Sequence, residues 1–307
     1  MRIRRKILNV MEPNREISAL LHLIDDPDTE VFTTVSERII SLGKDIIPNL
    51  EHLWENTIEE EVQERIEMLI HRLHFQDLQL EFTDWARKEY PDLMDGAYLV
   101  SKYKFTDLHL SASNQELDRL RKNIWLELNS YLTPLEQINV VNKIFYSFHK
   151  FKGVEISYQN QEDFLVNKVL ETKKGNSIAN GILYQSVCQM LDIPVRAINI
   201  PRQFILAYFD NSSDYFNPNP APNKILFYID PVSGQVYTQK DVEHYFNRIS
   251  VQPSASYFKP MSNQRIIRFL LEEYAKCFDD EKNRYKLEEL LGLGEILKDR
   301  GQRTEGS

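Results

Sequence analysis

A serine stands where a helix is expected to begin, in the stretch KKGNSIANGILYQSVCQMLDIPVRA at residues 173–197. Ser177 opens a helical pattern that ends before Ile193-Pro194, and β-branched residues follow. The N-terminus of a helix carries partial positive charge, so it can stabilise an ionised nucleophile. A serine there can equally cap the helix by accepting backbone N–H groups. We favour the capping role, because a serine hydroxyl is a weak nucleophile without an adjacent base.

Other residues capable of chemistry are scattered along the chain. Cys188 lies inside the expected helix among apolar residues and is interpreted as a small buried hydrophobe. Cys277 has no histidine near it in the sequence. His149 is interpreted as a surface or helix-end histidine, and His244, in DVEHYF, is not expected to reach Ser177.

Metal binding has only a weak signal. His71 and His74 are three residues apart on an expected helix, a spacing compatible with a metal in principle. The adjacent Arg72 and the lack of a nearby cysteine favour a surface face instead. The sequence therefore predicts neither a metal ion nor a cofactor.

Strands are expected directly after this helix. The runs IPVRAINI, FILAYFD and KILFYID are rich in Ile, Val, Phe and Tyr. The segment NSSDYFNPNPAPN separates the last two and is expected to be a loop. Short connections without intervening helices predict antiparallel pairing.

A helix followed by an antiparallel sheet is the plan of papain-like enzymes, and residues from about 90 to 297 resemble one group of them. The resemblance rests on FHKFKG, on FLVNKVLETKKGNSIANGILYQSVCQMLDIPVRAINIPRQFIL and on YIDPVSGQVYT. With these motifs the chain is similar to the transglutaminase-like superfamily, specifically its bacterial SirB-type branch. The resemblance implies a papain-like core with helices before and after it.

The resemblance also implies where a catalytic triad would lie. The family's nucleophilic cysteine precedes the glycine of a Gly-Ile-Pro turn by fifteen residues, and counting back from Asp192 gives Ser177. The family histidine, in a Pro-Gly-His-Phe context, corresponds to Gln203 in PRQF. Asp230 of the Asp-Pro motif is the one member retained. Ser177, Gln203 and Asp230 are thus vestigial triad positions, and no catalytic residue is assigned.

The replaced residues carry a structural prediction of their own. We expect Ser177 to cap the helix, with Gln203 and Asp230 on neighbouring strands facing its N-terminus. A glutamine can donate and accept hydrogen bonds, so Gln203 could bridge the serine hydroxyl and the aspartate. Asp230 is interpreted mainly as a turn-forming residue before Pro231.

Outside this core the pattern is helical. Apolar residues in the segment from about 14 to 90 recur at helical spacing after about thirty residues, which resembles HEAT-type helical hairpins. We predict an α+β, mostly helical fold with this division: HEAT-like hairpins at 1–90, a transglutaminase-like core with a helical lead-in at 91–262, C-terminal helices at 263–297, and a disordered tail at 298–307.

Composition excludes several classes of protein. The 307 residues are 42% hydrophobic and 27% charged, which is typical of a soluble globular protein. The net charge of −9 disfavours binding to nucleic acid, and the basic cluster of Arg2, Arg4, Arg5 and Lys6 is interpreted as a solvated end. Two distant cysteines and no apolar run of about 20 residues favour a cytoplasmic protein without a membrane segment.

Three functional hypotheses remain. The leading one is a catalytically silent transglutaminase-like protein with a binding or scaffold role. The first alternative is a hydrolase or amide-transferring enzyme that uses Ser177 with an unidentified base. The second is a protein-interaction module formed by the N-terminal hairpins. A protein or peptide partner is compatible with all three, and neither its identity nor the oligomeric state is specified by the sequence.

Overall fold

The computed structural model describes residues 15–210 and 225–297. The N-terminal basic cluster, the expected loop at 211–223 and the expected disordered tail at 298–307 lie outside these residues. The chain divides into two compact units, residues 1–81 and 82–307. The expected α+β, mostly helical fold with a small antiparallel sheet is confirmed.

The described part of the first unit is helical, as the repeated apolar spacing predicts. A helix at residues 15–22 is followed by α2 (Thr29–Ser41), a 3₁₀ turn (Lys44–Ile46), α3 (Ile47–Asn56) and the start of α4 (Glu60–Arg87). The Asp28 side chain caps α2 by accepting from the backbone N–H of Glu30. Whether this unit also binds a partner stays a prediction.

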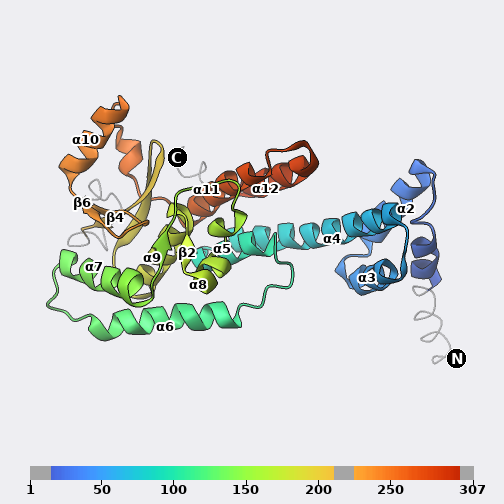
Figure 1. The fold of residues 1–307 in the computed structure, drawn as a ribbon, viewed down its shortest axis with the longest axis horizontal. Helices are drawn as coiled ribbons and strands as arrows, with labels where there is room; N and C mark the ends of the chain where they lie inside the picture. Colours follow the sequence, from blue (N-terminus) through green and yellow to red (C-terminus); the bar gives the residue numbers. More distant parts are fainter. Residues whose placement is uncertain (1–14, 211–224, 298–307) are drawn as a thin grey trace. The chain divides into compact units, whose positions relative to one another are not determined.

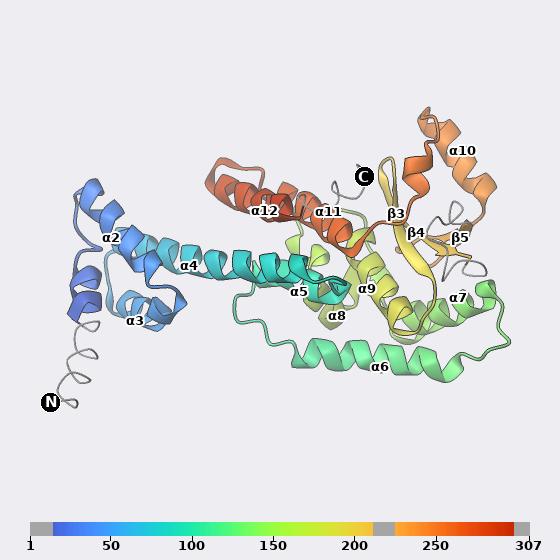
Figure 2. The ribbon, with the colours of Figure 1, turned by 180° about the vertical axis from the view of Figure 1, so that it is seen from behind.

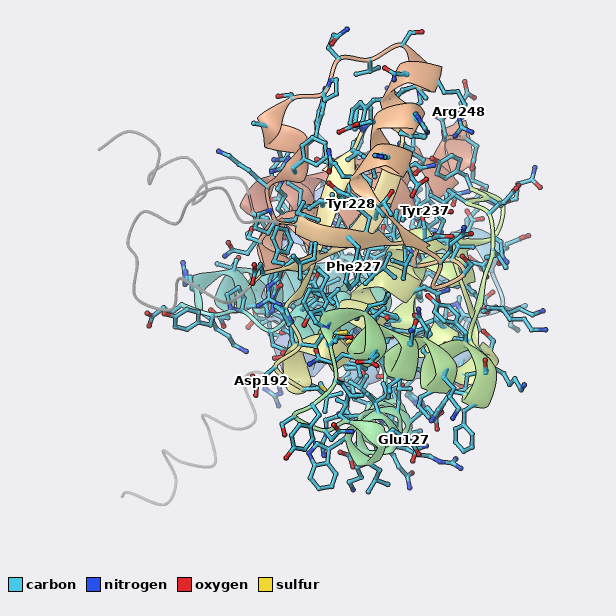
Figure 3. The ribbon with its side chains drawn as sticks, turned by 90° about the vertical axis from the view of Figure 1, so that its left-hand side faces the viewer. Glu127, Asp192, Phe227, Tyr228, Tyr237 and Arg248 are labelled. Atoms are coloured by element: carbon cyan, nitrogen blue, oxygen red, sulfur yellow. The ribbon has the colours of Figure 1, made fainter. Side chains whose placement is uncertain are left out.

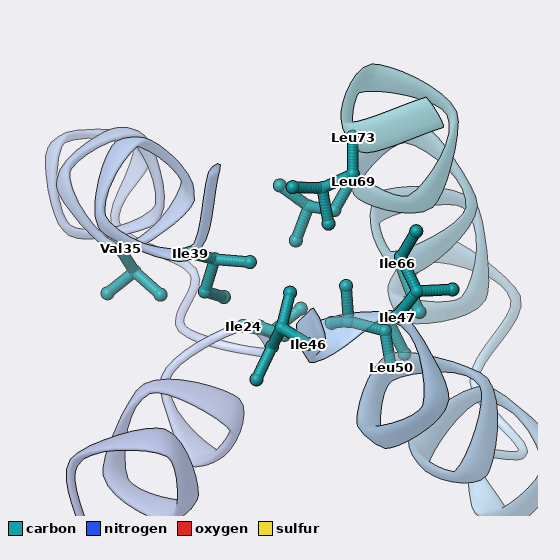
Figure 4. Close-up of a cluster of buried hydrophobic side chains, with 9 residues drawn as sticks. All are labelled: Ile24, Val35, Ile39, Ile46, Ile47, Leu50, Ile66, Leu69 and Leu73. Atoms are coloured by element: carbon teal, nitrogen blue, oxygen red, sulfur yellow. The ribbon is translucent and has the colours of Figure 1, made fainter. Parts of the chain in front are cut away.

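One apolar cluster holds the first unit together (Figure 4). Its members come from the same helix faces that recur in the sequence, so burial explains the spacing. The buried members are Ile24, Val35, Ile39, Ile46, Ile47, Leu50, Ile66, Leu69 and Leu73.

The second unit contains helices before and after its four-stranded sheet. The α-helices are α5 (Leu93–Lys102), α6 (Ser111–Glu127), α7 (Pro134–Asn142), α8 (Val166–Thr172), α9 (Ser177–Met190), α10 (Gln239–Ile249), α11 (Asn263–Ala275) and α12 (Arg284–Ile296). A π-helical turn, Lys143–Phe148, continues α7, and short 3₁₀ turns lie at Gln161–Phe164, Ala255–Phe258, Lys276–Phe278 and Glu281–Asn283. Thr133 and Glu136 form a reciprocal capping box at the start of α7.

The sheet has four antiparallel strands in the order β3 (Val195–Ile200), β4 (Gln203–Phe209), β5 (Ile225–Ile229) and β6 (Val236–Tyr237). The three predicted strands and their antiparallel pairing are therefore confirmed, and β6 is an addition. A separate parallel pair, β1 (Lys152–Gly153) with β2 (Lys174–Gly175), was not predicted because two-residue strands leave no periodic pattern. This pair leads directly into α9.

The sheet lies between α9 and α10 (Figures 1 and 2). Alternate residues of a strand point to opposite faces, so Phe204 contacts α9 while Ile205 joins the cluster that includes Val242 and Phe246 of α10. A Cβ added at Gly181 of α9 would lie 2.5 Å from the Phe204 ring. The helix that carries the candidate site is therefore packed closely against the strand that follows it.

Nearly all of α9 is buried. Every residue from Ile178 to Cys188 is inaccessible to solvent, including Asn180, Gln185 and Ser186. The side chain of Gln185 accepts a hydrogen bond of 2.6 Å from the backbone N–H of Ala197 on the edge strand β3. A helix buried on all sides belongs to a core, and the partly exposed Ser177 at its N-terminal end lies next to the cleft described below.

Candidate functional site

Asn176, and not Ser177, caps α9. The Asn176 Oδ1 accepts hydrogen bonds of 3.0 Å from the backbone N–H groups of both Ile178 and Ala179. The capping prediction for Ser177 was therefore wrong by one residue, because β2 holds the chain extended through Asn176 and asparagine is an equally favoured cap. Ser177 is the first helical residue, is partly exposed, and its hydroxyl makes no hydrogen bond to any described residue.

Gln203 opens β4 immediately after the two-residue turn Pro201-Arg202 that joins it to β3. Its side chain is exposed and has no hydrogen-bond partner among residues 15–210 and 225–297. The predicted bridge from Ser177 through Gln203 to Asp230 is therefore absent. An exposed amide is satisfied by water, so no buried polar group forces it to reach the serine.

Asp230 forms the turn between β5 and β6. Its two carboxylate oxygens accept hydrogen bonds from the backbone N–H of Val232, at 2.9 Å, and from the hydroxyl of Ser233, at 2.7 Å. The backbone carbonyl of Asp230 also accepts from Gly234, at 2.7 Å. The structure thus gives Asp230 the turn-forming role expected of an Asp-Pro pair.

A cleft of about 1100 Å³ nevertheless brings the three positions together. Ser177, Gln203 and Asp230 all contribute to its lining, from three separate elements. Opposite parts of its wall come from the segment 155–158, from α10 and from α11. The three positions therefore line one cleft, and no hydrogen bond links their side chains in the described part of the chain.

His244 also lines this cleft, although its position in the sequence did not predict this. It lies on α10, which packs on the opposite face of the sheet from α9, and it is exposed. Spacing along the chain cannot reveal such a placement, because it depends on how α10 folds back over β5. No hydrogen bond joins His244 to Ser177 in the described part of the chain.

His149 is buried, so its interpretation as a surface residue was wrong, although it does lie at a helix end. Its Nδ1 is 3.0 Å from Glu116 Oε1 on α6, and its Nε2 is 3.0 Å from the Asn123 amide. Lys173 Nζ donates to the same Glu116 oxygen at 2.5 Å. This cluster connects α6 to His149, which precedes β1, and to Lys173, which immediately precedes β2.

Burial and the contacts between these residues shift the pKa values of His149 and Glu116. Burial lowers the pKa of His149, and the hydrogen bond to Glu116 only partly opposes that effect. Burial by itself raises the pKa of Glu116, but the hydrogen bonds from Lys173 and His149 outweigh it, so the pKa lies below its usual value. At neutral pH the arrangement is therefore a neutral imidazole and an ion pair.

The two cysteines do not take part in the cleft. Cys188 is fully buried, as predicted, and burial raises the pKa of its thiol far above the usual range. Burial also raises the pKa of Cys277, to about 11. Both thiols are therefore protonated and unreactive at neutral pH.

Metal ligands are not grouped in the described residues. Within 15–210 and 225–297, no set of three or more His, Cys, Asp and Glu side chains is arranged to hold a metal ion. The His71 ring stacks on Phe75, at 6.5 Å between ring centres. In the same part of the chain, no helix is both long and apolar enough to cross a membrane.

Comparison with known proteins identifies the fold. The family model described as the transglutaminase-like superfamily matches residues 111–272, more than half of the chain. The chain belongs to the transglutaminase-like superfamily. The match includes Ser177, Gln203 and Asp230, which confirms the family on which the triad positions were assigned; it leaves α5 and α12 outside.

Individual relatives of the chain are distant. A UPF0162 protein of Buchnera aphidicola is 23% identical over 184 residues, which are 57% of this chain and 63% of that protein. Protein SirB1 of Salmonella typhimurium is 22% identical over 209 residues, covering 67% of this chain and 72% of SirB1. F-box only protein 21 of Mus musculus is 30% identical over 71 residues, 23% of this chain and 11% of that protein. The chain thus spans less than two thirds of the first of these relatives, and no solved structure matches it.

Proposed function

We propose that this protein is a catalytically silent member of the superfamily whose cleft binds a peptide segment of a partner. The observation that carries the proposal is the environment of Ser177. Its hydroxyl has no hydrogen-bond partner among the described residues, and the position of the base is occupied by the amide of Gln203.

Chemistry of the family type needs a group that can take a proton from the nucleophile. A glutamine amide has no proton affinity at neutral pH, so Gln203 cannot serve as a base. In a serine protease, removal of either the nucleophile or the base lowers kcat by roughly 10⁶-fold. A member with both positions replaced is therefore expected to have no measurable turnover of the family type.

The cleft itself suits an extended peptide. Its volume of about 1100 Å³ exceeds the range of roughly 300–1,000 Å³ that is usual for small-molecule sites. Aromatic side chains from several elements line it, among them Tyr237, Tyr245, Tyr257 and Phe269. Aromatic residues supply large contact area at low entropic cost, which is why binding surfaces are enriched in them.

One observation favours the enzymatic alternative. His244 is the imidazole that lines the cleft with Ser177 in the described part of the chain, so it is the candidate for the unidentified base. A general base must come within about 3 Å of the hydroxyl, directly or through one water molecule. This alternative predicts that Ser177 and His244 are both required for labelling by a serine-directed probe.

Activity and binding are tested separately. Three samples are compared: the unchanged protein and the variants Ser177→Ala and His244→Ala. Each is incubated with a serine-directed fluorophosphonate probe. In a second assay, each is incubated with an amine donor and glutamine-containing peptides. We expect no labelling or transfer above the Ser177→Ala background. Labelling of Ser177 that His244→Ala abolishes would establish the hydrolase instead.

Binding is measured by passing a pool of short random-sequence peptides over the immobilised protein and sequencing those retained by mass spectrometry. The comparison variant is Ile156→Ala/Tyr237→Ala, which removes two apolar side chains from the cleft lining. Ile156 is exposed and Tyr237 is only partly buried, so the fold should tolerate both changes. Retention of no peptide class, or equal retention by the variant, would contradict a peptide-binding cleft.

A further inference from the structure

Two arginines converge on one tyrosine at the wall of the cleft. Tyr245 of α10 donates a hydrogen bond of 2.8 Å to the carbonyl of Pro201, which joins α10 to the β3–β4 turn. The Arg248 guanidinium lies 5.4 Å from the centre of the Tyr245 ring. Burial raises the pKa of the Tyr245 phenol, and the positive charges of Arg202 and Arg248 both oppose that rise. Arg202 and Arg248, which line the cleft, therefore lie close to the same side chain.

Most other charged groups of the cleft already have partners. The carboxylates of Asp230 and Asp241 accept hydrogen bonds within their own turns. Glu273 accepts from the Tyr158 hydroxyl at 2.9 Å and from Lys276 at 2.6 Å. Glu155, on the separate segment 155–158, is an exposed carboxylate of the lining without such a partner.

Arg202 and Arg248 differ from these paired groups. Neither guanidinium forms an ion pair or a hydrogen bond to any residue within 15–210 and 225–297, and both residues are exposed. Figure 3 shows Arg248 on α10, on the same side of the sheet as Tyr237. His244, one turn earlier on α10, adds a third nitrogen-bearing side chain to the same wall. A guanidinium offers a planar fork of donors that matches a carboxylate.

The backbone at Arg202 is in the left-handed region, as it also is at Lys150, Lys173, Asp192 and Ser250 among the described residues. Arg202 has φ of +64°, in the left-handed region, at the second position of a proline-initiated turn. Glycine is the usual residue at that position, and the family pattern Pro-Gly-His-Phe places a glycine there. An arginine in this conformation is strained relative to glycine, and residues held in such conformations cluster at functional sites.

We propose that Arg202 and Arg248 bind the carboxylates of an acidic peptide that lies in the cleft against Tyr245. The proposal rests on the proposed function, since it names the partner class of the same cleft. The chain has a net charge of −9, and the cleft lining also carries Glu155, Asp230, Asp241 and Glu273, so selection of an acidic peptide would depend on direct contact of its carboxylates with Arg202 and Arg248.

The experiment uses the retained fraction of the random peptide pool and then two matched synthetic peptides. One peptide is a retained sequence with its Asp and Glu residues, and the other replaces them by Asn and Gln. Dissociation constants come from fluorescence anisotropy of the labelled peptides. We expect enrichment of acidic residues and about tenfold weaker binding for each arginine removed, in Arg202→Gln and Arg248→Gln. The control Lys240→Gln removes one charge from α10 outside the cleft lining and should leave binding unchanged.

Arg202→Gly separates binding from folding. Glycine relieves the left-handed strain, so the midpoint of thermal unfolding should stay the same or rise while acidic-peptide binding weakens about tenfold. Equal binding of the acidic and amide peptides overturns this inference but leaves a peptide-binding cleft intact, whereas retention of no peptide contradicts the proposed function itself. Enrichment confined to phosphorylated peptides, or equal loss in Lys240→Gln, also overturns the inference.

Discussion

The strongest quantitative prediction concerns the buried cluster around Glu116, which holds His149, before β1, and Lys173, immediately before β2. We predict that Glu116→Gln loosens this region far more than a charge removed from the exposed side of the same helix. The carboxylate accepts from His149 and Lys173 at one oxygen, whereas a neutral amide oxygen can replace only part of that interaction. The side chain of His149 is only 4% exposed, so a partner lost there is not fully replaced by water.

The magnitude follows from the two kinds of interaction on α6. A hydrogen bond to a charged group contributes about 1.5–3 kcal/mol, so the loss should be about 2 kcal/mol. The control is Asp118→Asn, whose ion pairs with Arg121 and Lys122 lie at the surface. Exposed pairs of this kind contribute about 0–1 kcal/mol. The two substitutions remove the same charge from the same helix and differ chiefly in burial.

The assay should report on the segments that contact Glu116, and not on the whole chain. The chain has two compact units, so a single free energy of unfolding is not well defined for it. Hydrogen exchange followed by mass spectrometry measures local opening in peptides that cover 111–127 and 143–178. A loss of about 2 kcal/mol corresponds to an opening constant about 30-fold larger for Glu116→Gln. Equal effects of Glu116→Gln and Asp118→Asn would refute the reasoning.

The same cluster predicts how stability depends on pH. The folded-state pKa of His149 and that of Glu116 are both lowered, so the unfolded chain binds more protons at each group as the pH falls. Protection, corrected for intrinsic exchange, should be full above about pH 6.5 and decline below it as the unfolded histidine protonates. A second decline should begin near about pH 4.3, from the carboxylate. His149→Gln should abolish the first decline in these peptides and keep the second.

Three further predictions concern the elements that position the cleft. Asn176→Ala should destabilise the second unit by about 1–2 kcal/mol in chemical denaturation, because two backbone N–H groups lose their acceptor. Ser177→Ala should change the stability by less than about 0.5 kcal/mol. The reverse ranking would contradict the assignment of Asn176 as the cap. Gly153→Ala should lower the midpoint of thermal unfolding, because its Cβ would lie 2.4 Å from the Val232 backbone. Gly292→Ala, in an open helical position, should leave the midpoint unchanged. An unchanged midpoint in Gly153→Ala would show that the contact is not tight. Ser177→Cys/Gln203→His should create a thiol with a pKa below about 8.5, measured by thiolate absorbance. A pKa at or above this value would mean that the helix N-terminus does not stabilise a thiolate at position 177.

The sequence allowed the secondary structure to be predicted better than the contacts at the site. Runs such as IPVRAINI and FILAYFD carry their own strand signal, and the recurrence from Ile17 to Leu73 reflects a shared buried face. The cap at Asn176 was misplaced by one residue because asparagine and serine are both favoured caps and only the pairing of β2 decides between them. The burial of His149 and the presence of His244 in the cleft depend on contacts between distant elements, which leave no spacing to detect.

The positions of Ser177, Gln203 and Asp230 can each be explained by a constraint on the backbone. Ser177 keeps its place because α9 is buried along its length and must begin where β2 ends, whatever side chain stands at the first turn. Gln203 keeps its place because the β3–β4 register fixes the start of β4, and Asp230 keeps its place because its carboxylate builds a turn. Each constraint acts on the backbone and none requires a nucleophile or a base. The placement of these three positions therefore supports the fold alone and is not evidence for or against catalysis.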